Sequence, residues 1–302
     1  MTRLSVAIVT FNEEKNIRRC LKSASWADEL VVVDGRSTDQ TAAIARKQGA
    51  RVYSVENQAI MKIMMNQAFK KCTGDWILSL DADETISPEL RGEIVETVSK
   101  DSSYSAYRLP RKNVIFGKWI EHSFWYPDLQ LRLFRRGKAE FPAENVHEEL
   151  RVEGSIGELK NPLEHLNYET VTQFIQKLDK YSTVEAEKLL VEGRKIVWQD
   201  AVRFPLLEFL TRFFAKQGYR DGLHGLVLAL LQAFYWEAVF AKVWEKQGFW
   251  QYGDQRFLEE VEEEGREVSR HWRHWLTVST PDPFKKLVSK ASNKIRTIIQ
   301  NV

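Results

Sequence analysis

The sequence predicts an α/β fold with a mostly parallel sheet in its first half and a helical region in its second half. Within the first hundred residues, short apolar runs alternate with segments of helical periodicity. Polar and acidic residues follow the ends of three of these runs, and from Val171 onward the periodicity is helical throughout. Because parallel strands are joined by helical crossovers, the alternation favours a sheet that is covered on both faces.

Four strands are expected, at residues 4–9, 29–33, 51–55 and 76–80, and the first of them is expected to be buried. Asn12 is expected to cap the first helix, with Glu13 and Glu14 in its first turn. Further helices are expected at residues 40–48, which Gly49 closes, at 59–71, and at 88–99, which Pro88 opens.

Composition limits the class of protein. The 302 residues include 44 basic and 42 acidic side chains, so the net charge of +2 gives no argument for a nucleic-acid partner. Two cysteines, Cys20 and Cys72, exclude a disulfide scaffold and fit a reducing compartment. The first residues lead directly into a strand pattern without a secretory signal, so a cytoplasmic location is expected.

Several nucleotide-binding classes are disfavoured because their phosphate-binding motifs are missing. The chain has neither a G-x-G-x-x-G after its first strand nor a G-x-x-x-x-G-K-[ST] anywhere, which argues against dinucleotide enzymes and P-loop NTPases. A nucleotidyltransferase usually needs a first loop rich in glycine and basic residues, whereas residues 10–15 contain neither Gly nor Arg.

The carboxyl ends of the predicted strands carry the candidate site. Ligands of open parallel sheets bind outside these ends. The polar residues there are Thr10, Asn12, Asp34, Asp81, Asp83 and Glu84.

Asp81 and Asp83 flank the small residue Ala82 on extended backbone, so their carboxylates are expected on one side of the chain. Such oxygens suit Mg²⁺ or Mn²⁺, which would neutralise a diphosphate leaving group. The alternative is an acidic turn that caps the helix beginning near Pro88.

Four segments in this order resemble glycosyltransferase family 2. They are TFNEE at 10–14, VVDGRSTDQT at 32–41, NQA at 66–68 and GDWILSLDADE at 74–84. The resemblance covers about residues 4–150 and is closest to the branch of the lipopolysaccharide core β-glucosyltransferases. It implies the GT-A fold, the Rossmann-like, mostly parallel sheet of nucleotide-diphospho-sugar transferases.

The resemblance also implies roles for individual residues on the nucleotide side. Thr10 and Phe11 would border the uridine, and Asp34 would accept a hydrogen bond from the base, unless Asp34 serves only the turn before Gly35. Asp81 would contact the nucleotide sugar and, with Asp83, would bind the metal.

Asn66 would help to hold the nucleotide together with a nearby basic residue. Relatives often place that basic residue directly before Asn66, where this chain has Met65, so Lys62 is the substitute. A solvated helix face is the alternative for Lys62 and Asn66. Asp39 is interpreted as a structural residue that caps the following helix.

On the acceptor side, the segment from 107 to 149 is rich in aromatic residues and arginine. Residues 129–134 alternate as a strand, with Gln130 and Arg132 on one face. Trp125 and Arg132 are candidates for contact with the acceptor or the diphosphate, because aromatic rings stack on sugars and arginine pairs with phosphate. The alternative is an ordinary amphipathic edge strand.

A base that removes the acceptor proton is expected in the segment NVHEE at 145–149. The resemblance assigns Glu148 as this general base, with Glu149 as the fallback. His147 would orient Glu148, contact the diphosphate or approach the metal, or would simply pack. His165 is interpreted as structural. Family membership implies inversion at the anomeric carbon by direct displacement.

The predicted organisation is a catalytic domain at 1–168 followed by a helical region at 169–302 associated with the membrane surface or the acceptor. Within the catalytic domain, residues 1–100 are the nucleotide-sugar half and 101–168 the acceptor half. In the helical region, Thr170 or Thr172 is expected to cap a helix at 174–192, and Pro205 to begin another.

After a break at 218–222, residues 223–243 are apolar but include Gln232 and Glu237. A buried helical hairpin or an interfacial helix fits them better than a membrane span. Residues 283–300 form a basic amphipathic pattern that indicates a membrane-surface anchor, or else a helix packed on the domain. Four tryptophans between 244 and 275 suit an interfacial belt or a large core.

Together these expectations describe an inverting, metal-dependent hexosyltransferase that is peripheral on the inner face of the cell membrane. The donor would be a UDP-sugar, and the acceptor a lipid-linked glycan such as lipopolysaccharide core or an undecaprenyl-linked oligosaccharide. The alternatives are transfer to polyprenyl phosphate itself, and an inactive membrane-associated sugar-binding scaffold.

Overall fold

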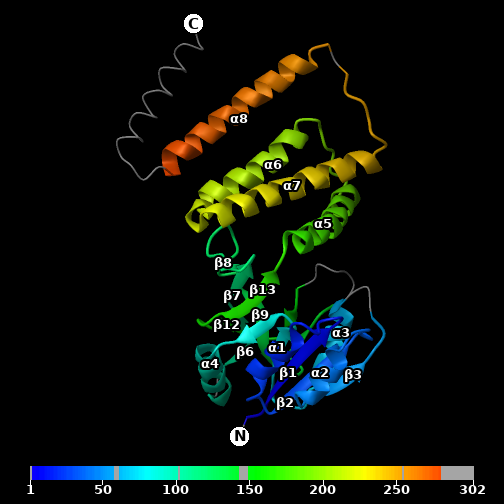
Figure 1. The fold of residues 1–302 in the computed structure, drawn as a ribbon, viewed down its shortest axis with the longest axis vertical. Helices are drawn as coiled ribbons and strands as arrows, with labels where there is room; N and C mark the ends of the chain where they lie inside the picture. Colours follow the sequence, from blue (N-terminus) through cyan, green and yellow to red (C-terminus); the bar gives the residue numbers. More distant parts are fainter. Residues whose placement is uncertain (1, 58–60, 101–102, 143–148, 254, 280–302) are drawn as a thin grey trace. The chain divides into compact units, whose positions relative to one another are not determined.

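The computed structural model describes residues 2–57, 61–100, 103–142, 149–253 and 255–279. The chain divides into two compact units. The first comprises Met1–Trp119 and Trp125–Asn167, and the second comprises Ile120–Phe124 and Tyr168–Val302. Figure 1 shows strands gathered in the first unit and long helices in the second, so the predicted α/β class with a helical C-terminal region is confirmed.

The main sheet of the first unit has seven strands in the order β12-β6-β9-β4-β1-β2-β3. Its strands are β1 (Leu4–Thr10), β2 (Glu29–Asp34), β3 (Arg51–Ser54), β4 (Trp76–Asp81), β6 (Tyr104–Leu109), β9 (Gln130–Arg135) and β12 (Ser155–Glu158). The four predicted strands β1 to β4 are mutually parallel, whereas β9 is antiparallel to both of its neighbours, β4 and β6. The sheet is therefore mixed but mostly parallel.

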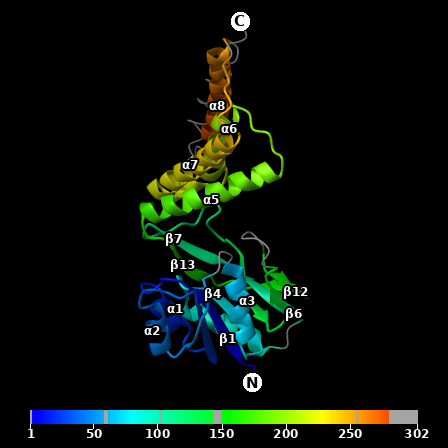
Figure 2. The ribbon, with the colours of Figure 1, turned by 90° about the vertical axis from the view of Figure 1, so that its right-hand side faces the viewer.

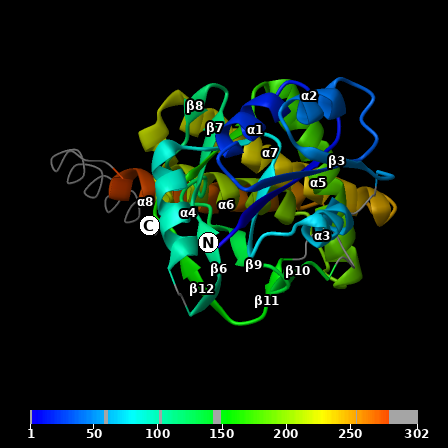
Figure 3. The ribbon, with the colours of Figure 1, turned by 90° about the horizontal axis from the view of Figure 1, so that it is seen from below.

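Helices cover both faces of this sheet, as the apolar strands predicted. They are α1 (Ile17–Ala24), α2 (Thr41–Lys47), α3 (Met61–Lys71) and α4 (Pro88–Ser99). Alternate residues of β1 and β2 enter two separate cores, one shared with α1, α2 and α4 and the other with α3. Figure 2 and Figure 3 show α1 and α2 on one side of β1 and α3 on the other.

The ends of these helices confirm some of the predicted capping residues and correct another. Gly49 follows α2 with a φ of +83°, the conformation in which glycine has no steric penalty. Asn12 does not cap α1, which begins five residues later at Ile17. Instead, Asn12 has a φ of +55°, and its Oδ1 accepts a hydrogen bond of 2.8 Å from the amide of Thr38 in the next strand-to-helix loop. Glu13 and Glu14 consequently lie before the first helical turn.

A smaller four-stranded sheet has the order β5-β13-β7-β8. It consists of β5 (Glu84–Ile86), β13 (Leu163–Tyr168), β7 (Arg111–Ile115) and β8 (Lys118–Trp119). A two-stranded ribbon pairs β10 (Ala139–Glu140) with β11 (Arg151–Val152). Strand β4 of the main sheet ends at Asp81, and β5 of the smaller sheet begins at Glu84. Residues 81–84 therefore connect the two sheets, and this segment is called the acidic junction below.

The second unit contains α5 (Val171–Val191), α6 (Asp200–Leu210), α7 (Leu223–Lys246) and α8 (Phe257–Ser279). Thr170, one of the two residues proposed for the cap, begins α5 with a capping box that it forms with Gln173. A π-helical turn (Thr211–Ala215) and a 3₁₀ turn (Gly218–Asp221) separate α6 from α7, which confirms the predicted break at 218–222.

The prediction that Pro205 begins a helix is wrong. Pro205 lies inside α6, which starts at Asp200, and the Asp200 carboxylate accepts a hydrogen bond of 3.0 Å from the amide of Val197. A proline at this position removes one backbone hydrogen bond. The residues after it, Phe209 and Leu210, are buried in an apolar cluster with α7, and this packing outweighs the loss.

Helix α7 packs on α5 and α6 through two apolar clusters. It is nevertheless the one helix among the described residues that is long and apolar enough to cross a membrane, with 33% of its apolar window buried. The predicted amphipathic segment at 283–300 lies outside the described residues.

Candidate active site

The carboxyl ends of three parallel strands lie along one edge of the main sheet, as the sequence predicts. In the strand register Thr10 of β1 is paired with Asp34 of β2, and Val9 of β1 is paired with Asp81 of β4. The parallel pairing therefore brings together residues that are separated by up to 71 positions in the chain.

Asp34 is buried, with 2% of its surface exposed, and it organises the loop after β2. Its carboxylate accepts hydrogen bonds from the amide of Ser37 at 3.0 Å and from the hydroxyl of Ser37 at 2.5 Å. The hydroxyl of the neighbouring Thr10 is buried and has no hydrogen-bond partner among the described residues. Phe11, which follows Thr10, is 41% exposed. These residues form a fixed edge with an exposed ring, and their contacts with uridine remain a prediction.

The loops after β1 and β2 are fastened to each other by side chains. Asp39 accepts hydrogen bonds from the amide of Thr41, at the start of α2, and from the amide of Glu14, at 2.9 and 3.2 Å. Together with the bond between Asn12 and Thr38, these contacts hold the two loops in one arrangement. Asp39 thus has a structural role, as the sequence indicated, although the N-cap position of α2 is Gln40 and not Asp39.

Asn66 and Lys62 lie on α3 and face the segment that follows β10. The side-chain amide of Asn66 donates to the carbonyl of Phe141 at 2.7 Å and accepts from its amide at 3.0 Å. The Lys62 ammonium lies 5.2 Å from the centre of the Phe141 ring. Asn66 also lines a pocket of about 500 Å³ beside the β10–β11 ribbon. The structure thus gives Asn66 a positioning function, and nucleotide contacts of Lys62 and Asn66 remain a prediction.

A buried arginine binds the acidic junction. Arg132 projects from β9, and its guanidinium forms ion pairs with Asp81 and with Glu84, the latter at 2.8 Å. The backbone amide of Asp81 donates to the Glu84 carboxylate at 2.9 Å. Arg132 and Glu84 have 8% and 0% of their side chains exposed, while Asp81 keeps 34%. The edge-strand alternative for residues 129–134 is excluded, because β9 lies between β4 and β6.

The charged groups in this cluster shift one another's pKa values. Burial opposes ionisation of Asp81, but the adjacent Arg132 guanidinium holds the pKa of that carboxyl below its usual range. Burial raises the pKa of Glu84, an effect that Arg132 opposes and the nearby Asp81 charge reinforces. Burial works to lower the pKa of Arg132, yet the two carboxylates raise it. Arg132 therefore favours the ionised form of Asp81, while burial makes ionisation of Glu84 harder.

A second arginine supports the cluster from β7. Arg111 lies 3.6 Å from Glu84 and donates from Nε to Asp128 at 2.7 Å. Asp128 also accepts from Asn113 at 2.9 Å and from Gln130 at 2.8 Å. Burial tends to raise the pKa of Asp128, but Arg111 and these hydrogen bonds lower it. The acidic junction is thus connected to the smaller sheet by fixed polar contacts.

His165, which the sequence analysis interpreted as structural, reaches Asp83. Its Nε2 lies 3.3 Å from the Asp83 carboxylate, and its Nδ1 lies 2.7 Å from Oδ1 of Asn113. The amide nitrogen of Asn113 donates to two acceptors, the carbonyl of Trp125 and the carboxylate of Asp128. The network therefore assigns Oδ1 of Asn113 as an acceptor and places a proton on Nδ1 of His165.

This assignment leaves Nε2 of His165 facing a carboxylate. A nitrogen lone pair and a carboxylate oxygen at this distance are donor atoms that a cation could share. The other carboxylate oxygen of Asp83, Oδ1, is buried and has no hydrogen-bond partner among the described residues. Asp83 and His165 thus offer oxygen and nitrogen donors that fit a divalent metal.

Within the described ranges no group of three or more His, Cys, Asp or Glu side chains could hold a metal. A two-residue donor set is compatible with Mg²⁺ or Mn²⁺, which keep positions for water and substrate phosphates. The alternative reading of the carboxylates as a helix cap is wrong, because Ser87 caps α4 with a hydrogen bond of 3.2 Å from the amide of Leu90.

The acceptor-side candidates are only partly described. Trp125 is half-buried just before β9, and its carbonyl accepts the hydrogen bond from Asn113. Arg132 is directed to the carboxylates rather than to an open surface. Glu148 and His147 lie outside the described residues, and Glu149 is exposed.

Comparison with known proteins shows which family this chain is similar to. Residues 5–150 match the family described as glycosyl transferase family 2. The chain is 27% identical over 257 residues to the lipopolysaccharide core biosynthesis glycosyltransferase LpsC of Rhizobium meliloti, covering 80% of this chain and 92% of that protein. It is 29% identical over 254 residues to an uncharacterized glycosyltransferase of Rickettsia typhi, covering 78% and 84% of the two chains.

Among solved structures, residues 1–349 of TarS from S. aureus align with a TM-score of 0.44 and 19% identity. The alignment covers 83% of this chain and 93% of that one.

Removal of the buried arginine should destabilise the first unit. Arg132→Met leaves Asp81 and Glu84 without their main counter-charge, and breaking a buried ion pair in this way costs about 3–5 kcal/mol. The measurement is the free energy of unfolding from urea titration. Arg18→Met removes an exposed arginine of α1 and should change stability by less than about 0.5 kcal/mol. Adding Glu84→Gln to Arg132→Met should restore part of the lost stability, because it removes one uncompensated carboxylate. Equal effects of Arg132→Met and Arg18→Met on stability would contradict the role of Arg132 as the buried counter-charge.

Proposed function

Because the chain belongs to glycosyl transferase family 2 and is related to a lipopolysaccharide core transferase, we propose that it transfers a hexose from a UDP-sugar to a lipid-linked glycan. The GT-A-type fold and the glycosyltransferase activity follow from the family. The donor, the metal and the acceptor are proposed. The observation that supports them best is the convergence of Thr10, Asp34, Asp81 and Asp83 on one sheet edge beside His165.

We propose that Asp83 and His165 hold a divalent cation. Asp83 contributes a buried oxygen without a partner among the described residues, and His165 contributes Nε2, which the Asn113 network orients. When bound, the cation would neutralise charge on the diphosphate leaving group. An imidazole ligand suits a transition metal better than Mg²⁺, so Mn²⁺ is the preferred ion.

The other residues of the edge would bind and orient the donor. Arg132 holds Asp81 ionised and fixed, and the exposed third of Asp81 remains available to a ligand or to the metal. The Asp34 loop, with Thr10 and Phe11, forms the proposed border of the uridine. Fixing these groups before the donor arrives reduces the cost of orienting the reacting centre.

Glu148 is the proposed general base, an assignment that rests on the family resemblance. It would take the proton from the acceptor hydroxyl as that oxygen attacks the anomeric carbon, while the bond from carbon to UDP breaks on the opposite face. The product then has inverted configuration, and no covalent intermediate with the enzyme forms. An inactive scaffold is the weaker candidate, because the whole set of carboxylates is intact.

The donor proposal is tested by calorimetric titration of the full chain with UDP, GDP and ADP, with and without Mn²⁺. We expect a preference for UDP that requires the metal. Asp83→Ala and His165→Ala should each abolish the metal-dependent part of UDP binding, because each removes a donor atom. Asp75→Ala is the matched control for a carboxylate outside the edge, since Asp75 bonds only the start of β1 among the described side-chain contacts. Metal-dependent UDP binding that survives Asp83→Ala would contradict the metal assignment.

The base is tested by Glu148→Gln. This change should leave UDP-sugar binding intact and reduce the turnover of transfer at least about 10²-fold, the low end for loss of a general base. Glu149→Gln is the control, and a larger effect there would move the base to the fallback residue. Unchanged turnover in Glu148→Gln would instead favour an acceptor that is already anionic, such as polyprenyl phosphate.

The proposed place of action is the cytoplasmic side of an anionic membrane surface. The support is the sequence pattern of residues 283–300, in which apolar residues share one helical stripe beside Lys285, Lys286, Lys290, Lys294 and Arg296. Each basic residue near an anionic leaflet contributes about 1 kcal/mol.

Truncation after Thr280 should therefore release the protein from anionic vesicles in a sedimentation assay. Neutral vesicles, to which the full chain should bind weakly, provide the control for non-specific association. Equal binding of the full and truncated chains to anionic vesicles would remove the anchor.

A further inference from the structure

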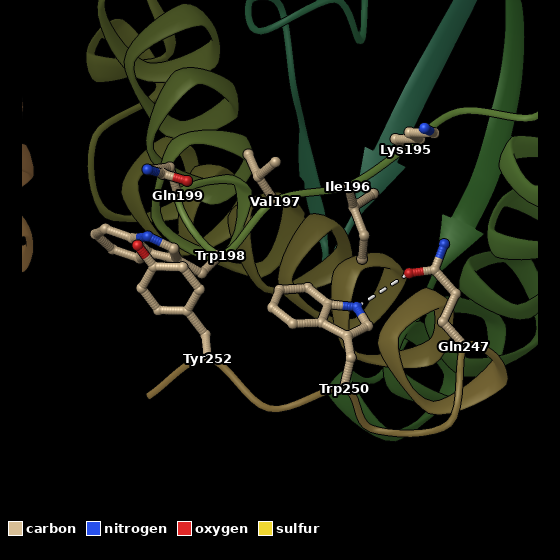
Figure 4. A pocket seen from close by; sticks show the side chains of 8 residues that line it. All are labelled: Lys195, Ile196, Val197, Trp198, Gln199, Gln247, Trp250 and Tyr252. Atoms are coloured by element: carbon tan, nitrogen blue, oxygen red, sulfur yellow. Dashed lines mark hydrogen bonds between the residues drawn. The ribbon is translucent and has the colours of Figure 1, made fainter. Parts of the chain in front are cut away.

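A pocket of about 490 Å³ lies within the helical unit (Figure 4). The candidate site at the carboxyl ends of β1, β2 and β4 belongs to the first unit and is called the strand-end site below. Two loops form it: one precedes α6 and the other follows α7. It is lined by Lys195, Ile196, Val197, Trp198, Gln199, Gln247, Trp250 and Tyr252. Its volume lies within the range of roughly 300–1,000 Å³ that is typical of small-ligand sites.

The lining combines aromatic rings with polar groups. Figure 4 shows Trp198 and Tyr252 close together on one side, with Trp250 and Gln247 on the other. Gln199 and Lys195 add an amide and an amine at the periphery of the same view. A few polar groups around apolar rings are characteristic of sites that orient a specific ligand.

One carboxylate fixes the first pair of rings. Glu260 of α8 accepts a hydrogen bond from Nε1 of Trp198 at 3.2 Å and from the hydroxyl of Tyr252 at 2.7 Å. Trp198 also packs edge-to-face against Phe257, with ring centres 5.1 Å apart. The two rings of the pocket are therefore held in place although Tyr252 is 41% exposed.

The second side of the pocket is fixed by backbone and amide contacts. The indole of Trp250 donates to Oε1 of Gln247 at 3.1 Å, and the carbonyl of Trp250 accepts from the indole of Trp244 at 2.9 Å. Because Oε1 of Gln247 accepts this bond, the Nε2 group is the donor end of the amide. Gly248, with a φ of +82°, provides the turn that brings Trp250 back towards Gln247.

We propose that this pocket binds a pyranose ring of a glycan, the acceptor in the proposed reaction, and in that respect the inference rests on the proposed function. A pyranose has an apolar C–H face, which packs on aromatic rings, and a hydroxyl edge, which needs amide and amine partners. Trp250 and Tyr252 provide the first kind of contact, and Gln199, Gln247 and Lys195 provide the second.

The chemistry of the lining argues against two other occupants. An acyl chain would remove the amides and the amine from water without giving them partners, which is unfavourable. A nucleotide diphosphate would meet a single ammonium group, Lys195, while the nearby carboxylate of Glu260 would repel it. A neutral sugar matches both features.

The test uses saturation-transfer NMR on the full chain, with delipidated lipopolysaccharide core oligosaccharide as the probe. Tyr252→Ala removes a stacking ring, and Gln247→Leu removes the donor while keeping the side-chain size. Each should weaken oligosaccharide binding about tenfold. Tyr181→Ala is the matched control, because Tyr181 is 47% exposed on α5 and does not line the pocket. Titration of each variant with UDP and Mn²⁺ reports separately on the strand-end site.

Loss of oligosaccharide binding in both pocket variants, with normal binding in Tyr181→Ala and normal UDP binding, would support the proposal. Equal oligosaccharide binding in all variants would overturn it and leave the proposed function intact. Signals from a decyl-chain detergent at the pocket, without any from the oligosaccharide, would also overturn it. If the native chain fails to bind UDP, the proposed UDP-sugar donor is wrong. The oligosaccharide data still test whether the pocket binds a glycan.

Discussion

The ion pairs between Arg132 and the two carboxylates Asp81 and Glu84 are the constraint on which the first unit depends. The chain leaves the main sheet at Asp81 and enters the smaller sheet at Glu84, so both carboxylates lie at a buried junction. Unpaired charges at such a place would cost several kcal/mol each. The antiparallel insertion of β9 beside β4 supplies the compensating charge. A strand from the second half of the unit thus compensates charges that the first half carries.

The same arrangement gives the acidic residues of the acidic junction different partners. Asp81 and Glu84 are engaged by Arg132, whereas Asp83, between them in sequence, faces His165 of β13. The register of β13 with β5 pairs His165 with Glu84, which brings the imidazole to the acidic turn. Asp81 and Glu84 thus share the charge of Arg132, while Asp83 has a separate partner in His165. Position, rather than acidity alone, distinguishes the roles of these residues.

The features predicted from sequence are those encoded locally. The strands β1 to β4 and the cap at Thr170 depend on neighbouring residues, and the structure has them. The position of β9 and the contact between His165 and Asp83 depend on pairings across more than fifty residues, for which one sequence holds no periodic signal. Asn12 and Pro205 were misplaced because tertiary contacts, a loop-to-loop hydrogen bond and core packing respectively, override local preference.

The helical unit shows a similar arrangement, with one carboxylate and two uncharged hydrogen-bond donors. There one carboxylate, Glu260, holds the polar ends of Trp198 and Tyr252, as one guanidinium holds two carboxylates in the first unit. In each case a single charged group satisfies two partners and fixes their relative geometry before any ligand binds. The tryptophans that suggested either an interfacial belt or a core thus include a third use, since Trp250 is anchored through its backbone and its ring lines a pocket. Rigid helices that position aromatic loops in this way reduce the ordering cost of binding, which is the physical reason for a recognition site to lie on such loops.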